Sequence, residues 1–180
     1  MNKSKQIRQD YHRWSKILHW TIALIVIPMV FGGFYLEDIP KIYRFSVIGW
    51  HKSLGLLVLM LMLFRYSVMA TYGRPALPNS VPGWQKFLAR SVQYGFYVAL
   101  LAMPIFGWIM STAAGYAPYF FGLGPIPFPG IEKNQALSDQ MFACHEWTAY
   151  VIIGLLVLHL LGAFKHYYLN RDGVVQKMLP

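Results

Sequence analysis

Four histidines lie inside long apolar stretches of the sequence: His19, His51, His145 and His159. An imidazole in lipid hydrocarbon is costly without a partner, so each of the four is a candidate functional residue. His145 and His159 are 14 residues apart. On one helix this separation corresponds to about four turns, about 21 Å of rise and nearly the same face. The spacing therefore predicts that a single helix carries one imidazole near each side of a membrane.

Four apolar runs are long enough to position these histidines in a bilayer, since a helix of about 20 residues crosses the hydrocarbon core. The predicted spans are residues 17–36, 47–70, 92–112 and 141–164. Charged residues make up 13% of the chain, well below the roughly one-quarter typical of soluble domains. We predict an all-α membrane protein in which residues 1–180 form one domain, an up-down bundle of four transmembrane helices.

The net charge of +9 is spread among the ends of the apolar runs, which favours a membrane topology over nucleic-acid binding. Twelve Lys and Arg flank one side of the spans: Lys3, Lys5, Arg8, Arg13, Lys16, Arg65, Arg74, Lys86, Arg90, Lys165, Arg171 and Lys177. Four flank the other: Lys41, Arg44, Lys52 and Lys133. Because cytoplasmic flanks carry the excess of Lys and Arg, both termini are predicted to be cytoplasmic. The run 17–36 is interpreted as a retained first span, since it is too long for the core of a cleaved signal.

In this orientation the histidines pair by depth. His51 and His145 lie near the outer face, and His19 and His159 lie near the inner face. Axial ligation of haem needs two opposed imidazoles with room for a flat ring between helices, so the pairs predict two b-type haems. Cys144 is the only cysteine and no C-x-x-C-H sequence contains it, so neither haem is expected to be covalently attached.

Zinc is disfavoured as the ligand of these pairs because it needs three or four converging side chains. Only Cys144 and Glu146 are candidates to join a pair, and both project about 100° away from His145 on the helix. The residue one turn after each histidine is small, which leaves room for a ring but also suits ordinary helix packing. These small residues are Ala23, Gly55, Ala149 and Ala163. The third span has no histidine and is predicted only to close the bundle.

The connection 113–140 is predicted to lie outside the membrane. Its segment 122–130 is rich in Gly and Pro, which indicates an irregular cap over the outer mouth of the bundle. Pro28 and Pro104 fall inside the first and third spans, where membrane helices tolerate a kink.

In these features the sequence resembles the bacterial cytochrome b561 family over nearly its whole length. The resemblance is carried by Leu-His-Trp (18–20), His51-Lys52-Ser53-Leu54-Gly55 followed by Arg65, His145-Glu146, Leu158-His159 and Lys-His-Tyr-Tyr-Leu-Asn-Arg-Asp (165–172). Tyr167 departs from the Lys-His-His form that is common in the family. The resemblance implies a di-haem protein of the bacterial inner membrane, which exchanges electrons between ubiquinone or another quinone and a donor at the outer face. Some members are similar to superoxide:ubiquinone oxidoreductase.

Cations near the predicted haems have two interpretations each. Lys52 and Arg44, together with Lys41 and Lys133, are candidates to attract a small anionic donor at the outer mouth. Lys52 is an equal candidate to neutralise a haem propionate. Arg65 is placed at the inner depth, where it either neutralises a propionate or extends to the interface.

Two further histidines, His12 and His166, are expected at the interface, with proton delivery as the alternative role. Two other functions stay open at this point. One is a haem-bearing membrane anchor for a hydrogenase or dehydrogenase, with a partner that the sequence does not name. The other is a transporter or proton channel that uses the histidines without haem.

Overall fold

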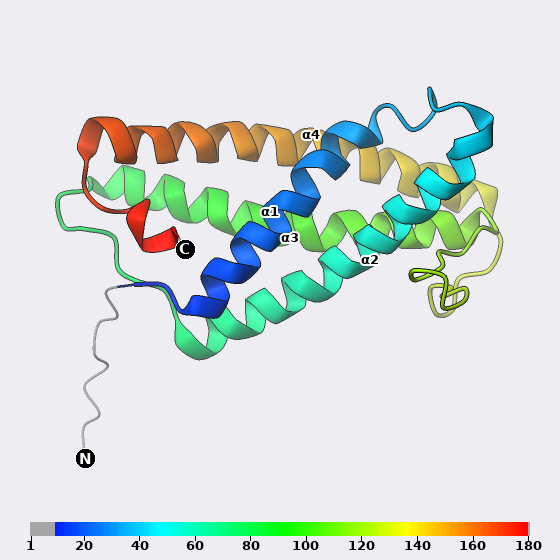
Figure 1. Ribbon diagram of the computed structural model, residues 1–180, viewed down its shortest axis with the longest axis horizontal. Helices are drawn as coiled ribbons and strands as arrows, with labels where there is room; N and C mark the ends of the chain where they lie inside the picture. Colours follow the sequence, from blue (N-terminus) through cyan, green and yellow to red (C-terminus); the bar gives the residue numbers. More distant parts are fainter. Residues whose placement is uncertain (1–9, 180) are drawn as a thin grey trace, which may run out of the picture.

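The computed structural model describes residues 10–179, and within that range the chain is helical (Figure 1). The elements are α1 (Arg13–Gly33), α2 (Lys41–Tyr72), α3 (Gly83–Ala113) and α4 (Gln135–Phe164), then a π-helical turn η1 (Lys165–Asn170) and a 3₁₀ turn η2 (Gln176–Met178). Four helices are long and apolar enough to cross a membrane. The prediction of an all-α membrane protein with four spanning helices is confirmed. Lys3, Lys5 and Arg8, which entered the charge count, lie outside the described residues.

Polar caps and helix-breaking residues set several helix ends. α1 begins where the His12 Nδ1 accepts a hydrogen bond from the Trp14 N–H at 3.3 Å. α4 begins in the same way, since the Asn134 side chain accepts from the Leu137 N–H at 3.0 Å. α2 ends at Tyr72, and the Gly73 that caps it has a φ of +70°, which is readily adopted only without a Cβ.

The helices differ from the predicted spans mainly at their starts. α2, α3 and α4 all begin before the apolar runs 47–70, 92–112 and 141–164, and α1 ends at Gly33, before residue 36. Hydropathy marks only the part of a helix that faces hydrocarbon, whereas the helical backbone continues into the polar interface. Interfacial helix ends therefore carry no hydropathy signal.

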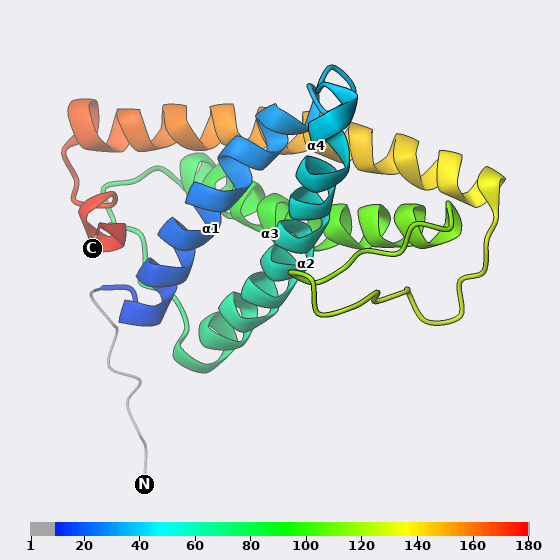
Figure 2. The same ribbon diagram turned by 45° about the vertical axis from the view of Figure 1, so that its right-hand side comes forward.

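α3 and α4 run side by side and make the most extensive helix contact (Figures 1 and 2). α2 packs on α3, and α1 packs on α2, both crossing the first pair obliquely. The core is narrow and is made of Leu18, Ile22, Val30, Val58, Met62, Val68, Ala99, Leu100 and Ile152. Most other side chains of the spans are exposed or half-buried, as expected of a narrow bundle whose surface lipid covers.

Each end of the bundle is covered by an irregular segment. At one end, residues 114–134 connect α3 to α4, at the same end of the bundle as the α1–α2 connection (Figure 1). At the other end, the C-terminal residues fold back, and the Trp20 Nε1–H donates to the Met178 carbonyl at 3.0 Å. The Lys177 Nζ also donates to the Ala76 carbonyl at 3.4 Å in the α2–α3 connection. The predicted irregular cap therefore has a counterpart at the opposite end.

Candidate functional site

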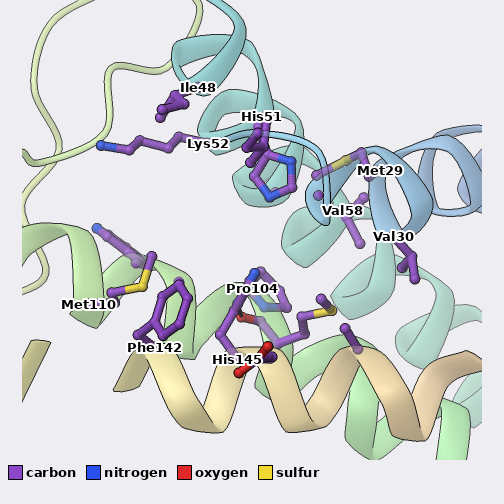
Figure 3. Close-up of a pocket in the computed structure, with 18 of the residues that line it drawn as sticks. Met29, Val30, Ile48, His51, Lys52, Val58, Pro104, Met110, Phe142 and His145 are labelled. Atoms are coloured by element: carbon purple, nitrogen blue, oxygen red, sulfur yellow. Dashed lines mark hydrogen bonds between the residues drawn. The ribbon is translucent and has the colours of Figure 1, made fainter. Parts of the chain in front are cut away.

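His51 of α2 and His145 of α4 face each other across a cavity (Figure 3). The centres of their rings are 6.3 Å apart, and the ring planes make an angle of 70°. The cavity has a volume of about 790 Å³ and is lined by residues from all four helices. This is the size range of pockets that enclose small molecules and cofactors.

The ring separation fits a metal held between two imidazoles. With a metal–nitrogen bond of about 2.0 Å, and about 1.15 Å from a ring centre to its nitrogen, two opposed imidazoles have centres about 6.3 Å apart. Two edge-to-face rings in direct contact also reach such distances. The cavity beside this pair distinguishes the two cases, because rings that only pack together need no space around them.

A single hydrogen bond settles which nitrogen of His145 is available. The His145 Nδ1 lies 2.8 Å from the Met103 carbonyl oxygen. Since a carbonyl only accepts, Nδ1 must carry the proton, and Nε2 is left with its lone pair for a ligand. A histidine that ligates a metal is usually held by its second nitrogen in this way.

The cavity walls are largely apolar, as the faces of a porphyrin require. Gly55 and Ala149, each one turn after a histidine of the pair, both line the cavity. Gly33 lies close to His51, since an ideal Cβ built there would be 3.7 Å from its Cε1. Met29, Val30, Pro104 and Phe142 complete the apolar lining shown in Figure 3.

Of the four cations predicted at the outer mouth, Lys52 and Arg44 line this cavity, whereas Lys41 and Lys133 are not among its lining residues. The Lys52 Nζ donates to the Tyr116 carbonyl at 2.9 Å, in the segment 114–134. The Arg44 guanidinium donates to the Glu37 carbonyl at 2.5 Å and to the Ile39 carbonyl at 3.1 Å. Each cation therefore fastens a connecting segment while its charge stays at the cavity wall.

Carboxylates share this mouth with the cations. Glu37, Asp38 and Glu146 line the same cavity. Charge at the mouth is therefore mixed in sign.

Ser53 joins the segment 114–134 to α2. Its hydroxyl donates to the Tyr119 carbonyl at 2.6 Å and accepts from the Phe121 N–H at 3.1 Å. The segment is also bound to α3, where the Trp108 Nε1–H donates to the Ile126 carbonyl at 2.7 Å. These bonds hold the segment against both helices beside His51 and His145.

His19 of α1 and His159 of α4 form the second pair. Their ring centres are 6.0 Å apart at an interplanar angle of 71°. Aromatic rings flank the pair edge-on. The ring centre of Trp20 lies 5.4 Å from that of His19, and the ring centre of Phe96 lies 5.7 Å from that of His159. The structure therefore brings the four histidines together in the two pairs that their depths indicate, at opposite ends of α4.

Arg65 lies beside the second pair. Its Nη1 donates to the Ser15 carbonyl at 2.8 Å, one turn before His19 on α1. The guanidinium therefore joins α2 to α1 at this depth. A propionate role for Arg65 stays a prediction.

The two interfacial histidines both have partners. His12 stacks on Tyr72 with ring centres 3.9 Å apart. The His166 Nδ1 lies 2.6 Å from a carboxylate oxygen of Asp172. Burial of Asp172 opposes its ionisation, but hydrogen bonds from His166 and the Val174 N–H outweigh this and lower the pKa of Asp172 below its ordinary value.

Sequence reasoning missed the contribution of α3, which it treated only as a helix that closes the bundle. Met103 supplies the carbonyl that orients His145, and Gly107 lies directly against the same imidazole. The only signal in the sequence is a proline followed three residues later by a glycine, Pro104 and Gly107, in the middle of an apolar span.

Comparison with known proteins identifies a family of cytochromes. The pattern of the prokaryotic cytochrome b561 family matches residues 10–180. "Cytochrome b561 homolog 2" of Escherichia coli (strain K12) is 28% identical over 172 residues, covering 92% of this chain and 88% of the relative. "Cytochrome b561 homolog 1" of the same organism is 26% identical, covering 94% and 98%.

A third relative carries an activity in its name. "Probable superoxide oxidase CybB" of Yersinia pestis is 27% identical over 165 residues, covering 91% of this chain and 92% of the relative. The family implies b-type haem and electron transfer in a multi-pass bacterial membrane protein, and the cavity between facing imidazoles fits such a group. By the match over nearly its whole length, the chain belongs to the prokaryotic cytochrome b561 family.

Proposed function

We propose that this chain is a self-contained electron-transfer protein that binds two b-type haems, His51 and His145 holding one and His19 and His159 the other. The carrying observation is that the imidazoles form two pairs with ring-centre separations of 6.3 and 6.0 Å, and that a cavity of about 790 Å³ lies beside the His51 and His145 pair. Haem supplies reversible one-electron chemistry when bound. Because each site offers two histidines that would hold the iron, no ligand position would be left open for dioxygen, and the residues favour electron transfer over dioxygen binding.

The shared helix supports transfer across the membrane. His145 and His159 both project from α4, four turns apart, so one rigid element fixes the separation of the two sites. His51 and His19 complete the sites from α2 and α1. A bundle built in this way gives an electron one position near each face of the bilayer.

The quinone pool is the proposed acceptor, and a small anionic donor at the outer face is the proposed source of electrons. Lys52 and Arg44 are the groups at the cavity wall that would attract an anion such as superoxide, against the three carboxylates that share the wall. The activity named for the relative from Yersinia pestis agrees with this donor. In the net reaction, two superoxide anions each lose one electron to become dioxygen, and one quinone takes up the two electrons and two protons to become quinol.

The proposed orientation places both termini in the cytoplasm and the outer pair toward the cell exterior, in the bacterial inner membrane. Its support is the excess of twelve Lys and Arg on one side of the spans over four on the other. Reporter fusions at residue 180 and within residues 114–134 test it. If a reporter that works only outside the cytoplasm is active at residue 180, the assignment is reversed.

The test uses the purified full-length chain, produced with ample haem supply and reconstituted with ubiquinone. Superoxide generated enzymatically is expected to reduce the haem absorbance reversibly and to produce quinol at one quinol per two superoxide anions. A His51→Ala variant made alongside is expected to lose this superoxide-dependent quinol. If the pure chain reduces quinone only after a soluble dehydrogenase is added, it is an anchor subunit instead. A colourless protein contradicts the haem proposal altogether.

A further inference from the structure

α3 carries no histidine, yet it makes the closest contacts with one of the four imidazoles. The Met103 carbonyl accepts the Nδ1 proton of His145 at 2.8 Å. Gly107, one turn further along α3, faces the same ring, and both residues line the cavity. Among the hydrogen bonds of the described residues, no corresponding bond is recorded for the rings of His19, His51 or His159.

Gly107 is required by the position of the imidazole rather than by its own backbone conformation. An ideal Cβ at residue 107 would lie 3.0 Å from the Cε1 of His145 and 3.2 Å from its Nδ1. An imidazole ring is rigid, so it must move as a whole to admit a methyl group. The atom at 3.2 Å is the one that donates to Met103, so that movement disturbs the hydrogen bond.

Gly95 provides an internal comparison on the same helix pair. A Cβ there would also come within 3.0 Å of α4, but its neighbour is Cδ2 of Leu155, the end of a flexible side chain. Leu155 can change rotamer at small cost, whereas the ring of His145 has no equivalent freedom while it is bound to Met103. Equal steric contact at these two glycines therefore has different consequences.

Pro104 fixes the local backbone that presents the carbonyl. It is buried inside α3 and forms the peptide bond that contains the Met103 carbonyl. Proline has no N–H to donate to the carbonyl four residues earlier, and such positions bend helices. The Pro104 and Gly107 pair thus brings backbone, rather than side chain, against His145.

We propose that α3 sets the orientation and the electron-donating strength of His145, and through it the reduction potential of the outer haem, by means of the Met103 carbonyl and Gly107. The inference rests on the proposed function, in which His145 ligates a haem. A hydrogen bond donated by the second nitrogen makes an imidazole a stronger electron donor. A stronger donor stabilises the oxidised metal and lowers its potential, so loss of the bond raises it.

The experiment is a redox titration of purified, haem-loaded variants followed by optical and low-temperature electron paramagnetic resonance spectra. The spectrum of a His51→Ala variant identifies the outer signal by its absence. Gly107→Ala is expected to raise the potential of the outer haem and shift its resonance, or to deplete that haem, while the inner signal stays unchanged. Gly95→Ala is the matched control for added bulk between α3 and α4, and Gly154→Ala, which meets nothing within 4 Å, is the control for the glycine replacement itself. Both controls are expected to leave the outer signal unchanged.

Two results with the glycine variants would overturn the inference. One is an outer potential and resonance that do not change in Gly107→Ala. The other is an outer shift as large in Gly95→Ala as in Gly107→Ala, which would assign the effect to helix separation. If Gly107→Ala does not accumulate, Pro104→Ala takes its place. This variant restores an N–H in α3 and is expected to shift the potential of the outer haem alone, by less than Gly107→Ala would. A shift confined to the inner haem contradicts the inference. If His145→Ala retains every haem that the wild-type chain binds, the proposed function itself is overturned.

Discussion

The two histidine pairs use the same residue type and share α4, yet their surroundings differ. At the outer pair, a backbone carbonyl of α3 holds His145, and a cavity of about 790 Å³ opens beside the rings. At the inner pair, Trp20 and Phe96 contact the rings edge-on. The outer end is covered by the segment 114–134, and the inner end by the folded-back C-terminus.

The difference shows that the helices with the proposed haem ligands are not the helix that orients His145. The proposed ligands of both sites come from α1, α2 and α4, whereas the hydrogen-bond partner of His145 comes from α3. α3, which supplies none of the proposed ligands, therefore distinguishes two sites whose proposed ligands are all histidines. Variants that act on one site alone are the way to break or sharpen this comparison.

The largest expected effect is the loss of one haem per chain. His145→Ala is expected to remove the outer haem and His159→Ala the inner one, because each deletes one of two axial ligands. Haem content per protein measured by the pyridine haemochrome assay is expected to fall by about half in each, and the potential that survives should differ between them. Loss of both haems from both variants would leave the pairing unsupported.

Ser53→Ala is expected to destabilise the outer end. Ser53 is 3% exposed. Its hydroxyl bonds two backbone groups of the segment 114–134, the Tyr119 carbonyl and the Phe121 N–H. Leaving such buried groups unpaired costs about 1–3 kcal/mol of folding stability. The variant is therefore expected to unfold at a lower temperature than the wild type when both are heated in detergent. Ser67→Ala is the control, because its exposed hydroxyl bonds only the Leu63 carbonyl within α2. Equal destabilisation by the two variants would contradict this role for Ser53.

Trp20→Phe is expected to affect the inner end alone. It keeps an aromatic ring beside His19 but removes the hydrogen bond to the Met178 carbonyl. The expected loss is about 0.5–1.5 kcal/mol in stability, with faster proteolysis of the C-terminal segment. Trp147→Phe, at an exposed position of α4, is the control. A changed outer spectrum in Trp20→Phe would show that the two ends are coupled.

The smallest expected effect is a pH dependence at the C-terminal turn. The pKa of Asp172 lies below its ordinary value of 3.8, so its contribution to stability is complete above that pH and is lost as the pH falls through the lowered pKa. Thermal unfolding of the wild type should therefore show an acid-dependent loss below pH 4 that Asp172→Asn lacks. Identical acid profiles for the two proteins would exclude a contribution from the His166 and Asp172 pair.

Much of the fold was accessible from the sequence, because an apolar run of about 20 residues has few alternatives to a spanning helix. The motifs around His51 and His145 also predicted the family, which is confirmed. The pairing of the four histidines was predicted from helix direction and spacing, and the structure places His51 beside His145 and His19 beside His159. These features depend on side-chain type and on local periodicity, both of which are visible in a single sequence.

The contacts that distinguish the two sites were not accessible in the same way. A backbone carbonyl has no residue type, so nothing marks Met103 as the partner of His145. Lys52 was interpreted only through its charge, whereas the carbonyl that it binds belongs to a segment whose path depends on tertiary packing. Helix ends in the interface were missed because polar helical residues resemble loop residues there.

The central claim, that each facing pair holds a haem, is tested most directly by counting haem in the purified wild-type chain. Haem and polypeptide should be quantified in the same sample, with reduced-minus-oxidised spectra and electron paramagnetic resonance of the oxidised form. We expect two haem b groups per chain and two low-spin signals, each typical of two axial imidazoles. A chain saturated with one haem, or one that stays colourless when haem is abundant, would contradict the claim.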